Sequence, residues 1–200
     1  EFTVDPSILD IWDMQLAACG ASIMYHRDKF IKKISEIGSK IHRGITNGSE
    51  NMIIRYVPNL KLDENLKNQE EIFYQALKKS FENDMRQRTT TKGPHKDNLE
   101  FFIDEINVRN FGSQGQQRTA ALSLKLAEIT IIKEESGEMP ILLLDDVMSE
   151  LDFERQEFLV KTLSDVQLFI TTTEIPEILT EKLPKGNTYY VEKGKVRLIE

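Results

Sequence analysis

The sequence predicts a mixed α/β fold, in which a mostly helical arm or lid subdomain over residues 1–90 precedes a lobe with a central β-sheet over residues 91–200. The first region has helical periodicity, whereas the second alternates short apolar segments with helical ones, as α/β layers do. The charge balance also changes. Residues 1–92 carry 14 Lys/Arg and 13 Asp/Glu, and residues 93–200 carry 12 and 20. This asymmetry indicates two regions with different roles.

The first region begins with one long predicted helix over residues 6–44. Asp5 followed by Pro6 is a typical helix start, and Gly44 provides a stop. Apolar residues recur every seven positions, which predicts a stripe that faces a partner helix. The stripe consists of Leu9, Leu16, Ile23, Phe30 and Ile37. A short strand is predicted over 51–57, and a second helix from Asp63 or Asn65 to about Arg88, so the two helices are expected to form an antiparallel hairpin.

The second region is predicted from short apolar segments between helices. The segment 141–144 is four consecutive apolar residues, which predicts a buried strand without a polar face. The other expected elements are a strand hairpin over 99–103 and 106–109, helices over 114–135 and 153–163, a strand over 167–172, a short helix, and a terminal hairpin over 189–191 and 195–199.

Composition restricts the classes of protein that fit. The hydrophobic fraction is 40% and the charged fraction 30%, as expected of a globular chain with a buried core. The apolar run at 140–144 is too short to cross a bilayer. The single cysteine, Cys19, cannot form an internal disulfide, which fits a reducing, cytoplasmic setting. The net charge of −7 argues against a surface uniformly suited to coating nucleic acid.

Two acids, Asp145 and Asp146, end the strand predicted over 141–144. Ligands bind at the carboxyl ends of strands in open α/β sheets. A buried strand ending in two acids is the Walker B arrangement, in which the first carboxylate holds Mg²⁺ and the second polarises the attacking water. The alternative is structural, because many strands end in Asp as a turn former.

About thirty residues earlier, Ser113-Gln114-Gly115-Gln116 begins the helix predicted over 114–135. A hydroxyl, free backbone N–H groups and the positive end of the helix dipole together suit an anion. This is the chemistry of the ABC signature loop, SGGQ in many members. The alternative is a capping serine beside a flexible glycine, with no ligand.

Just after the two acids, residues 149–152 (Ser-Glu-Leu-Asp) match the D-loop of ABC ATPases, although Asp152 alone could serve as a helix cap. The order and spacing of the three motifs favour an ABC-type ATPase head. The histidine expected after the next strand is replaced by threonines at 171–173, and Thr172 is the candidate for that position. No G-x-x-x-x-G-K-[ST] sequence is present, so the phosphate-gripping Walker A element is absent from these 200 residues.

The chain resembles the RecF family of SMC-like ABC ATPases. The resemblance rests on Gly93-Pro-His-Lys-Asp97, on the segments 113–122 and 144–152, and on the three threonines. It implies the C-terminal part of a protein of DNA replication, recombination, repair and the SOS response. Such proteins bind ATP and Mg²⁺, form ATP-dependent homodimers at junctions of single- and double-stranded DNA, and work with RecR and RecO to load a recombinase.

The resemblance also implies roles for single residues. Asp145 would bind Mg²⁺, Asp146 would polarise water, and Asp152 would lie on the dimer seam. The loop residues Ser113, Gln114, Gly115 and Gln116 would meet the γ-phosphate held by the other subunit. Without a Walker A element, the chain alone is expected to be inactive as an ATPase.

Two other functions remain open at this point. One is a nucleotide-independent module that binds DNA or RecR. The other is part of a different SMC-like ABC ATPase. A basic stretch on the long predicted helix would suit DNA phosphates, or it is only a solvated helix face. It comprises Arg27, Lys29, Lys32, Lys33, Lys40, His42 and Arg43.

Overall fold

The computed structural model describes residues 6–163, 166–173 and 186–199. The short helix expected after residue 173 lies outside the described residues. The chain divides into two compact units, Glu1–Ala127 and Glu128–Glu200. The boundary predicted from composition, near residue 90, falls earlier than this division. The mixed fold class is confirmed, with the strands arranged in three small sheets.

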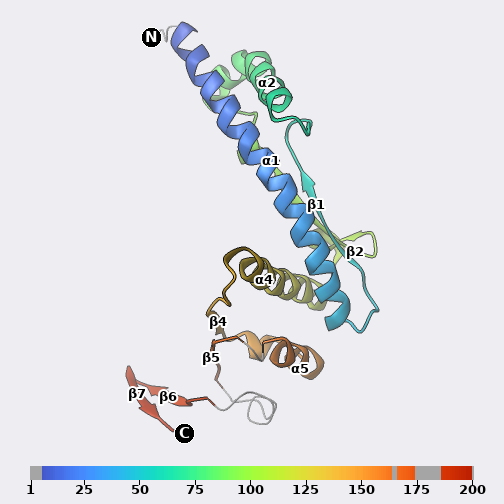
Figure 1. The fold of residues 1–200 in the computed structure, drawn as a ribbon, viewed down its shortest axis with the longest axis vertical. Helices are drawn as coiled ribbons and strands as arrows, with labels where there is room; N and C mark the ends of the chain where they lie inside the picture. The colour runs from blue at the N-terminus through green and yellow to red at the C-terminus, as the bar shows by residue number, and fades with distance from the viewer. Residues whose placement is uncertain (1–5, 164–165, 174–185, 200) are drawn as a thin grey trace. The chain divides into compact units, whose positions relative to one another are not determined.

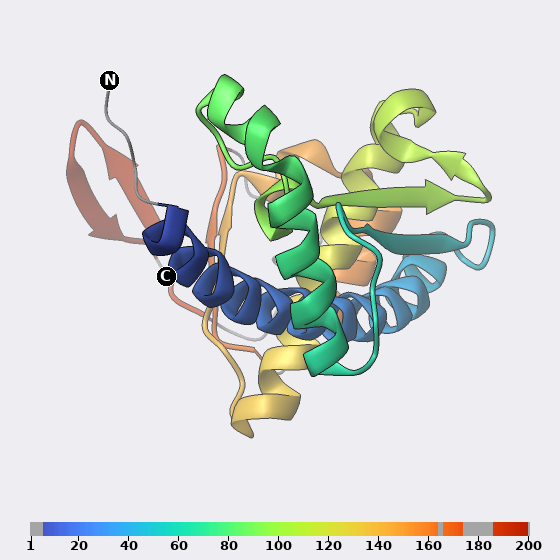
Figure 2. The same ribbon diagram turned by 90° about the horizontal axis from the view of Figure 1, so that it is seen from above.

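Two long helices, α1 (Pro6–Ile45) and α2 (Leu66–Gln87), lie side by side in the first unit (Figures 1 and 2). They are antiparallel, because Gln69 on α2 contacts Met24 while Tyr74 contacts Asp10, further back along α1. The predicted helical hairpin is therefore confirmed. The stripe predicted to face the partner helix is wrong, because Leu16, Ile23 and Phe30 are exposed, and the packed face of α1 carries Ala17 and Met24 instead. Asn65 caps α2 by accepting hydrogen bonds from the backbone N–H groups of the next turn, and the helix ends at Arg88 in the left-handed conformation.

The core of this hairpin is built around Phe73, which is fully buried. Its ring lies against two glycines. A Cβ atom placed on Gly20 would lie 2.1 Å from Cε1 of Phe73, and one on Gly93 would lie 2.6 Å from Cζ. These glycines therefore allow helix α1 and the turn at residue 93 to approach the ring closely. The packing around Phe73 includes Ala17, Met24, Leu60 and Leu77.

The same unit contains an antiparallel sheet in the order β1-β2-β3, formed by Met52–Val57, Asn98–Ile103 and Ile106–Asn107. β1 and β2 pair along their whole length, from Met52 opposite Ile103 to Val57 opposite Asn98. The prediction that β3 continues through residue 109 is wrong, because the strand ends at Asn107 and helix α3 (Val108–Phe111) begins at the next residue. The Asn107 side chain accepts a hydrogen bond from the Asn110 N–H, and this local cap replaces further strand pairing.

A buried carboxylate ties the Gly-Pro-His turn to the sheet. The turn contains the short 3-10 helix η1 (Pro94–Lys96) and ends at Asp97, whose side chain is 1% exposed. Asp97 accepts hydrogen bonds from the Arg27 guanidinium at 3.0 Å, from the Asn59 N–H at 2.7 Å and from the Tyr56 hydroxyl. A buried charge needs such partners, so this turn has a structural role.

The Tyr56 hydroxyl predicts a pH dependence of stability. Burial raises its pKa above the ordinary tyrosine value, and the hydrogen bond to Asp97 raises it further. The phenol therefore keeps its proton to higher pH when folded than when unfolded. The resulting stabilisation is complete below a pH of about 10 and is lost as the pH rises above it. Urea midpoints of Tyr56→Phe are expected to fall less than wild-type midpoints between about pH 9 and about pH 11. Equal falls would contradict this assignment.

The second unit contains a parallel pair, β4 (Leu142–Asp145) with β5 (Leu168–Thr171), helix α5 (Phe153–Thr162), and the hairpin β6 (Tyr189–Glu192) with β7 (Lys195–Leu198). The 3-10 helix η2 (Val147–Glu150) links β4 to α5. α4 (Gln114–Ser136) begins in the first unit and continues into the second.

The prediction that β4 is a buried strand is wrong in this chain, since Leu143 is 72% exposed and its β5 neighbour Phe169 is 55% exposed. No helix in the described part of the chain is long and apolar enough to span a membrane.

Candidate functional site

The two acids lie where β4 ends, beside the last residue of β5. Asp145 is opposite Thr171 in the parallel register. The Thr171 hydroxyl donates a 2.5 Å hydrogen bond to Oδ1 of Asp145. This bond fixes the orientation of the carboxylate and leaves Oδ2 available to a further ligand. The structure therefore presents Asp145 as an exposed, oriented carboxylate at the carboxyl end of a strand.

Asp146 turns the chain away from the strand. Its backbone is left-handed, with φ 52° and ψ 19°, a conformation that Asp tolerates better than most residues. The Asp146 N–H donates to both the carbonyl oxygen and the hydroxyl of Thr171, each at 3.1 Å. The Asp146 carbonyl accepts from the Ser149 hydroxyl at 2.8 Å. The backbone is thus held on both sides, and the exposed carboxylate is presented to solvent.

Sequence reasoning singled out Thr172 and missed Thr171. Strand β5 ends at Thr171, and Thr172 is the next residue, half-buried. No sequence signal distinguished the two threonines, because the strand register, which places Thr171 opposite Asp145, is set by the fold. Thr171 therefore contacts both acids, and the role of Thr172 stays a prediction.

The signature-like loop is a capping box at the start of α4. The Ser113 hydroxyl accepts from the Gln116 N–H at 3.2 Å, and the Gln116 side-chain oxygen accepts from the Ser113 N–H at 3.0 Å. The Gln114 and Gly115 N–H groups belong to the first turn, where no intrahelical acceptor exists. The structural alternative, a capping serine, is thus confirmed as geometry. Anion binding by this loop stays a prediction, and the cap is compatible with it because the Ser113 hydroxyl keeps its own hydrogen to donate.

Asp152 is the N-cap of α5. Its carboxylate accepts from the Arg155 N–H at 3.0 Å and pairs with the Arg155 guanidinium. Gln156 joins this turn to the preceding 3-10 helix by donating to the carbonyl oxygens of Met148 and Leu151. Met148 is fully buried, so the D-loop segment is anchored at both ends.

The capping role of Asp152 can be measured. Asp152→Ala is expected to lower the free energy of unfolding by about 1 kcal/mol, because the helix loses its capping acceptor. Asp152→Asn should change it by only a few tenths of a kcal/mol, roughly, since Asn caps equally well. Denaturant unfolding of both variants tests this. An equal loss in both would show that the charge of Asp152, rather than its cap, carries the stability.

These residues suit Mg²⁺ and a nucleotide. Mg²⁺ is commonly held by one or two carboxylates together with substrate phosphates and waters, so Asp145 fits as a single protein ligand. Within residues 6–163, 166–173 and 186–199, no group of three or more His, Cys, Asp or Glu side chains could hold a metal without further ligands. The structure assigns the two acids to the second unit and the Ser113 loop to the first.

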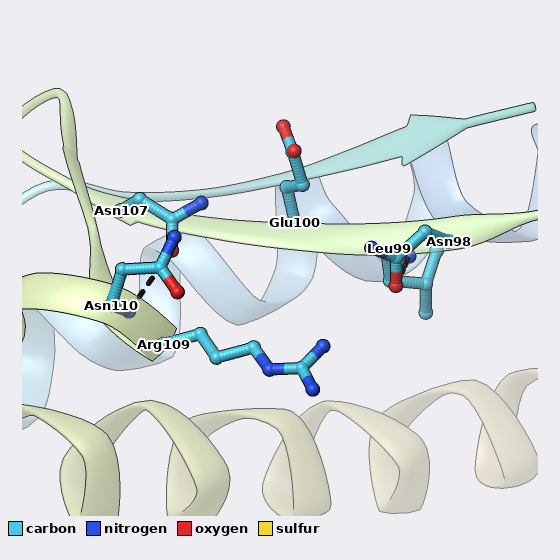
Figure 3. Close-up of a pocket in the computed structure, with 6 residues that line it drawn as sticks. All are labelled: Asn98, Leu99, Glu100, Asn107, Arg109 and Asn110. Carbon is cyan, nitrogen blue, oxygen red and sulfur yellow. Dashed lines mark hydrogen bonds between the residues drawn. The ribbon is translucent and has the colours of Figure 1, made fainter.

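A shallow polar hollow of about 220 Å³ occurs elsewhere in the first unit. Figure 3 shows its lining from β2, β3 and α3, with the Arg109 side chain extended alongside β2. None of the motif residues contributes to it. Its lining residues are Asn98, Leu99, Glu100, Asn107, Arg109 and Asn110.

The basic stretch on α1 is less uniform than its sequence suggests. His42 is fully buried, and Arg27 bonds Asp97. Lys32 and Lys40 are exposed, but each pairs with an acid four residues earlier, Asp28 and Glu36 respectively. Both predicted alternatives for this stretch, contact with DNA phosphates and a solvated helix face, are therefore wrong for His42.

Comparisons with known proteins identify relatives of this chain. No protein-family model matches the chain. The DNA replication and repair protein RecF of Alkaliphilus oremlandii is 47% identical over 190 residues, covering 94% of this chain and 52% of that protein. RecF of Lactococcus lactis subsp. lactis is also 47% identical, over 195 residues, covering 96% of this chain and 51% of that protein. The chain thus spans about half the length of the curated relatives it matches.

Solved structures extend the likeness to three dimensions. A structure of the recombination mediator RecF with ATP, in the RecFOR pathway, is 33% identical and covers all of this chain and 52% of its own, with a TM-score of 0.85. A structure from work on ATP-driven dimerization and DNA-stimulated activation of SMC ATPases is 14% identical with a TM-score of 0.50, and supports the fold alone. Over the half of its relatives' length that it matches, this chain belongs to the RecF family.

Proposed function

We propose that this chain supplies the signature loop, Walker B acids and D-loop of a RecF-type ATPase that acts in DNA repair. The observation that carries the proposal is the pair Asp145 and Asp146, held at the end of β4 by Thr171. A turn-forming Asp would not need a side-chain donor from the neighbouring strand, whereas a metal-binding carboxylate benefits from this orientation. The match to RecF solved with ATP supports the same nucleotide.

In the proposed mechanism, each acid has one task. Asp145 would hold a Mg²⁺ ion through Oδ2, and the Thr171 hydroxyl keeps Oδ1 turned toward β5. Asp146 orients and polarises the attacking water through its exposed carboxylate. The Mg²⁺ ion supplies charge neutralisation on the phosphates. Thr172, in the position of the switch histidine, offers a hydroxyl but no group that titrates near neutral pH.

The Ser113 loop acts on a nucleotide bound by a second subunit. The Ser113 hydroxyl and the N–H groups of Gln114 and Gly115 form an anion site at the start of α4. Gln116 completes the loop through its capping bond. Asp152 lies at the proposed dimer seam. ATP would thereby join two subunits, because each nucleotide needs donors from both.

The wider role is also a proposal. ATP-dependent homodimers would bind junctions of single- and double-stranded DNA and, with RecR and RecO, help load a recombinase at gaps. This role would maintain replication forks. It depends on a Walker A lobe that is not in these 200 residues, so the chain alone is proposed to be inactive.

The test compares this chain alone with a full-length protein that joins it to a Walker A lobe. The chain alone is expected to show no ATP hydrolysis above background, whereas the full-length protein should hydrolyse ATP and dimerise when ATP and Mg²⁺ are added. Gel-shift titrations with gapped DNA at two salt concentrations form a second arm. DNA binding by the chain alone, together with a full-length protein that neither dimerises nor hydrolyses ATP, would favour the nucleotide-independent module instead.

A further inference from the structure

A chain of hydrogen bonds runs from the Ser113 loop to the end of helix α1 and back, entirely within the first unit. The Gln116 side-chain nitrogen donates to Oε1 of Glu50 at 3.0 Å. Oε2 of Glu50 lies 3.1 Å from Nε2 of His42, and Nδ1 of His42 lies 3.1 Å from the Ser123 hydroxyl. His42 and Glu50 lie at the end of α1 and just before β1, and Ser123 lies on α4, so two segments distant in sequence meet here.

Further hydrogen bonds lead from Ser123 back to the Ser113 loop. The Ser123 hydroxyl donates to the Thr119 carbonyl at 2.7 Å, and the Thr119 hydroxyl donates to the Gly115 carbonyl at 2.8 Å. His42, Thr119 and Ser123 are fully buried. The network therefore reaches the loop at two points, the Gln116 side chain and the Gly115 backbone.

Chemistry restricts the direction of each bond. The Thr119 carbonyl can only accept, so the Ser123 hydroxyl donates to it and presents a lone pair to Nδ1 of His42. An ionised Glu50 accepts from Nε2 of His42 as it accepts from the Gln116 side-chain nitrogen. The buried ring thus links Ser123 on α4 to Glu50.

The carboxylate in turn fixes the Gln116 amide. Its nitrogen faces Glu50 and its oxygen faces the Ser113 N–H, and a flipped amide would place two oxygens against each other. Gln116 is therefore held in the rotamer that closes the capping box. The Ser113 hydroxyl and the Gly115 backbone are positioned as a consequence.

We propose that Glu50, held by His42, is a positioning residue for the signature loop. It keeps the Gln116 amide, and through it the Ser113 loop, in the geometry that meets the partner subunit's nucleotide. This inference rests on the proposed function. It also implies that Gln116 serves the loop through its own bonds to Ser113 and Glu50, in addition to the phosphate contact expected from sequence.

The test uses Glu50→Gln, which keeps the shape and removes the charge. In the full-length protein with its Walker A lobe, this variant is expected to bind ATP as wild type does. It should require about tenfold more protein for half-maximal ATP-dependent dimerisation, because a charge-assisted hydrogen bond that positions the loop is lost. The matched control is Glu36→Gln on the exposed face of α1, where Glu36 pairs only with Lys40, and it should dimerise as wild type does.

A second readout does not depend on nucleotide. In NMR spectra of the 200-residue chain, the Gln116 side-chain amide should shift in Glu50→Gln and not in Glu36→Gln. Glu50→Asp keeps the charge beside His42 and serves if Glu50→Gln fails to fold, with an expected intermediate effect on both readouts. Wild-type dimerisation with an unshifted Gln116 amide in a folded variant would overturn the positioning role. A wild-type protein that does not dimerise with ATP would overturn the proposed function, whatever the amide signal.

Discussion

Asp146→Asn in the full-length protein is expected to lower the rate of ATP hydrolysis by about 100-fold or more, the range in which a lost acid–base group acts. ATP binding and ATP-dependent dimerisation should persist, because the Asp146 carboxylate is proposed to act on the attacking water and not on the phosphates. Asparagine is the suitable replacement, since it tolerates the left-handed backbone at this position. The measurement is steady-state phosphate release at saturating ATP and Mg²⁺.

Two other variants make this prediction specific. Asp145→Asn should instead weaken the Mg²⁺ dependence of nucleotide binding, because that carboxylate is the proposed metal ligand. Asp28→Asn removes a half-buried acid on α1 that pairs with Lys32 and belongs to none of the motifs, and it should hydrolyse ATP at the wild-type rate. Near-wild-type turnover in Asp146→Asn would remove this residue from the chemistry and leave the turn-forming role.

The second large effect is on stability. Phe73→Ala is expected to lower the free energy of unfolding of the first unit by about 3–5 kcal/mol, the usual cost of truncating a buried phenylalanine. The cost should be near the upper end, because Gly20 and Gly93 have no side chains that could relax into the cavity. Chemical denaturation followed by circular dichroism measures it.

Phe81 on the same helix provides the matched control. It lies two turns further along α2 and is 41% exposed, so Phe81→Ala should cost much less. A similar loss in both variants would mean that α2 is held by its general apolar character and not by the contact of Phe73 with the two glycines.

Most elements were predictable because their signals are local. Helix α1 was predicted over 6–44 and found over Pro6–Ile45, since the start at Pro6 and the stop near Gly44 need only neighbouring residues. The cap at Asn65 fixed α2 in the same way. The error at 108–109 is also local in origin, because the Asn107 side chain competes with the strand ladder and begins α3.

Which distant strands pair with one another could not be predicted from the sequence. β1 was assigned to the helical arm, yet it pairs with β2, which follows α2 in the sequence and was assigned to the second region. That pairing moves β2 and β3 into the first unit. Periodicity shows that a segment is extended, but it carries no information about which distant strand supplies the hydrogen bonds.

The candidate site divides in the same way. Residue type and order were enough to predict the chemistry: two acids after an apolar strand, a Ser-Gln-Gly-Gln helix start, and a capping Asp152. Only the tertiary structure decided which groups orient them. Thr171 reaches Asp145 through strand register, and Glu50 reaches Gln116 through the packing of α1, β1 and α4. The physical reason is that a hydrogen bond of about 3 Å is set by where distant backbones lie, which no short stretch of sequence encodes.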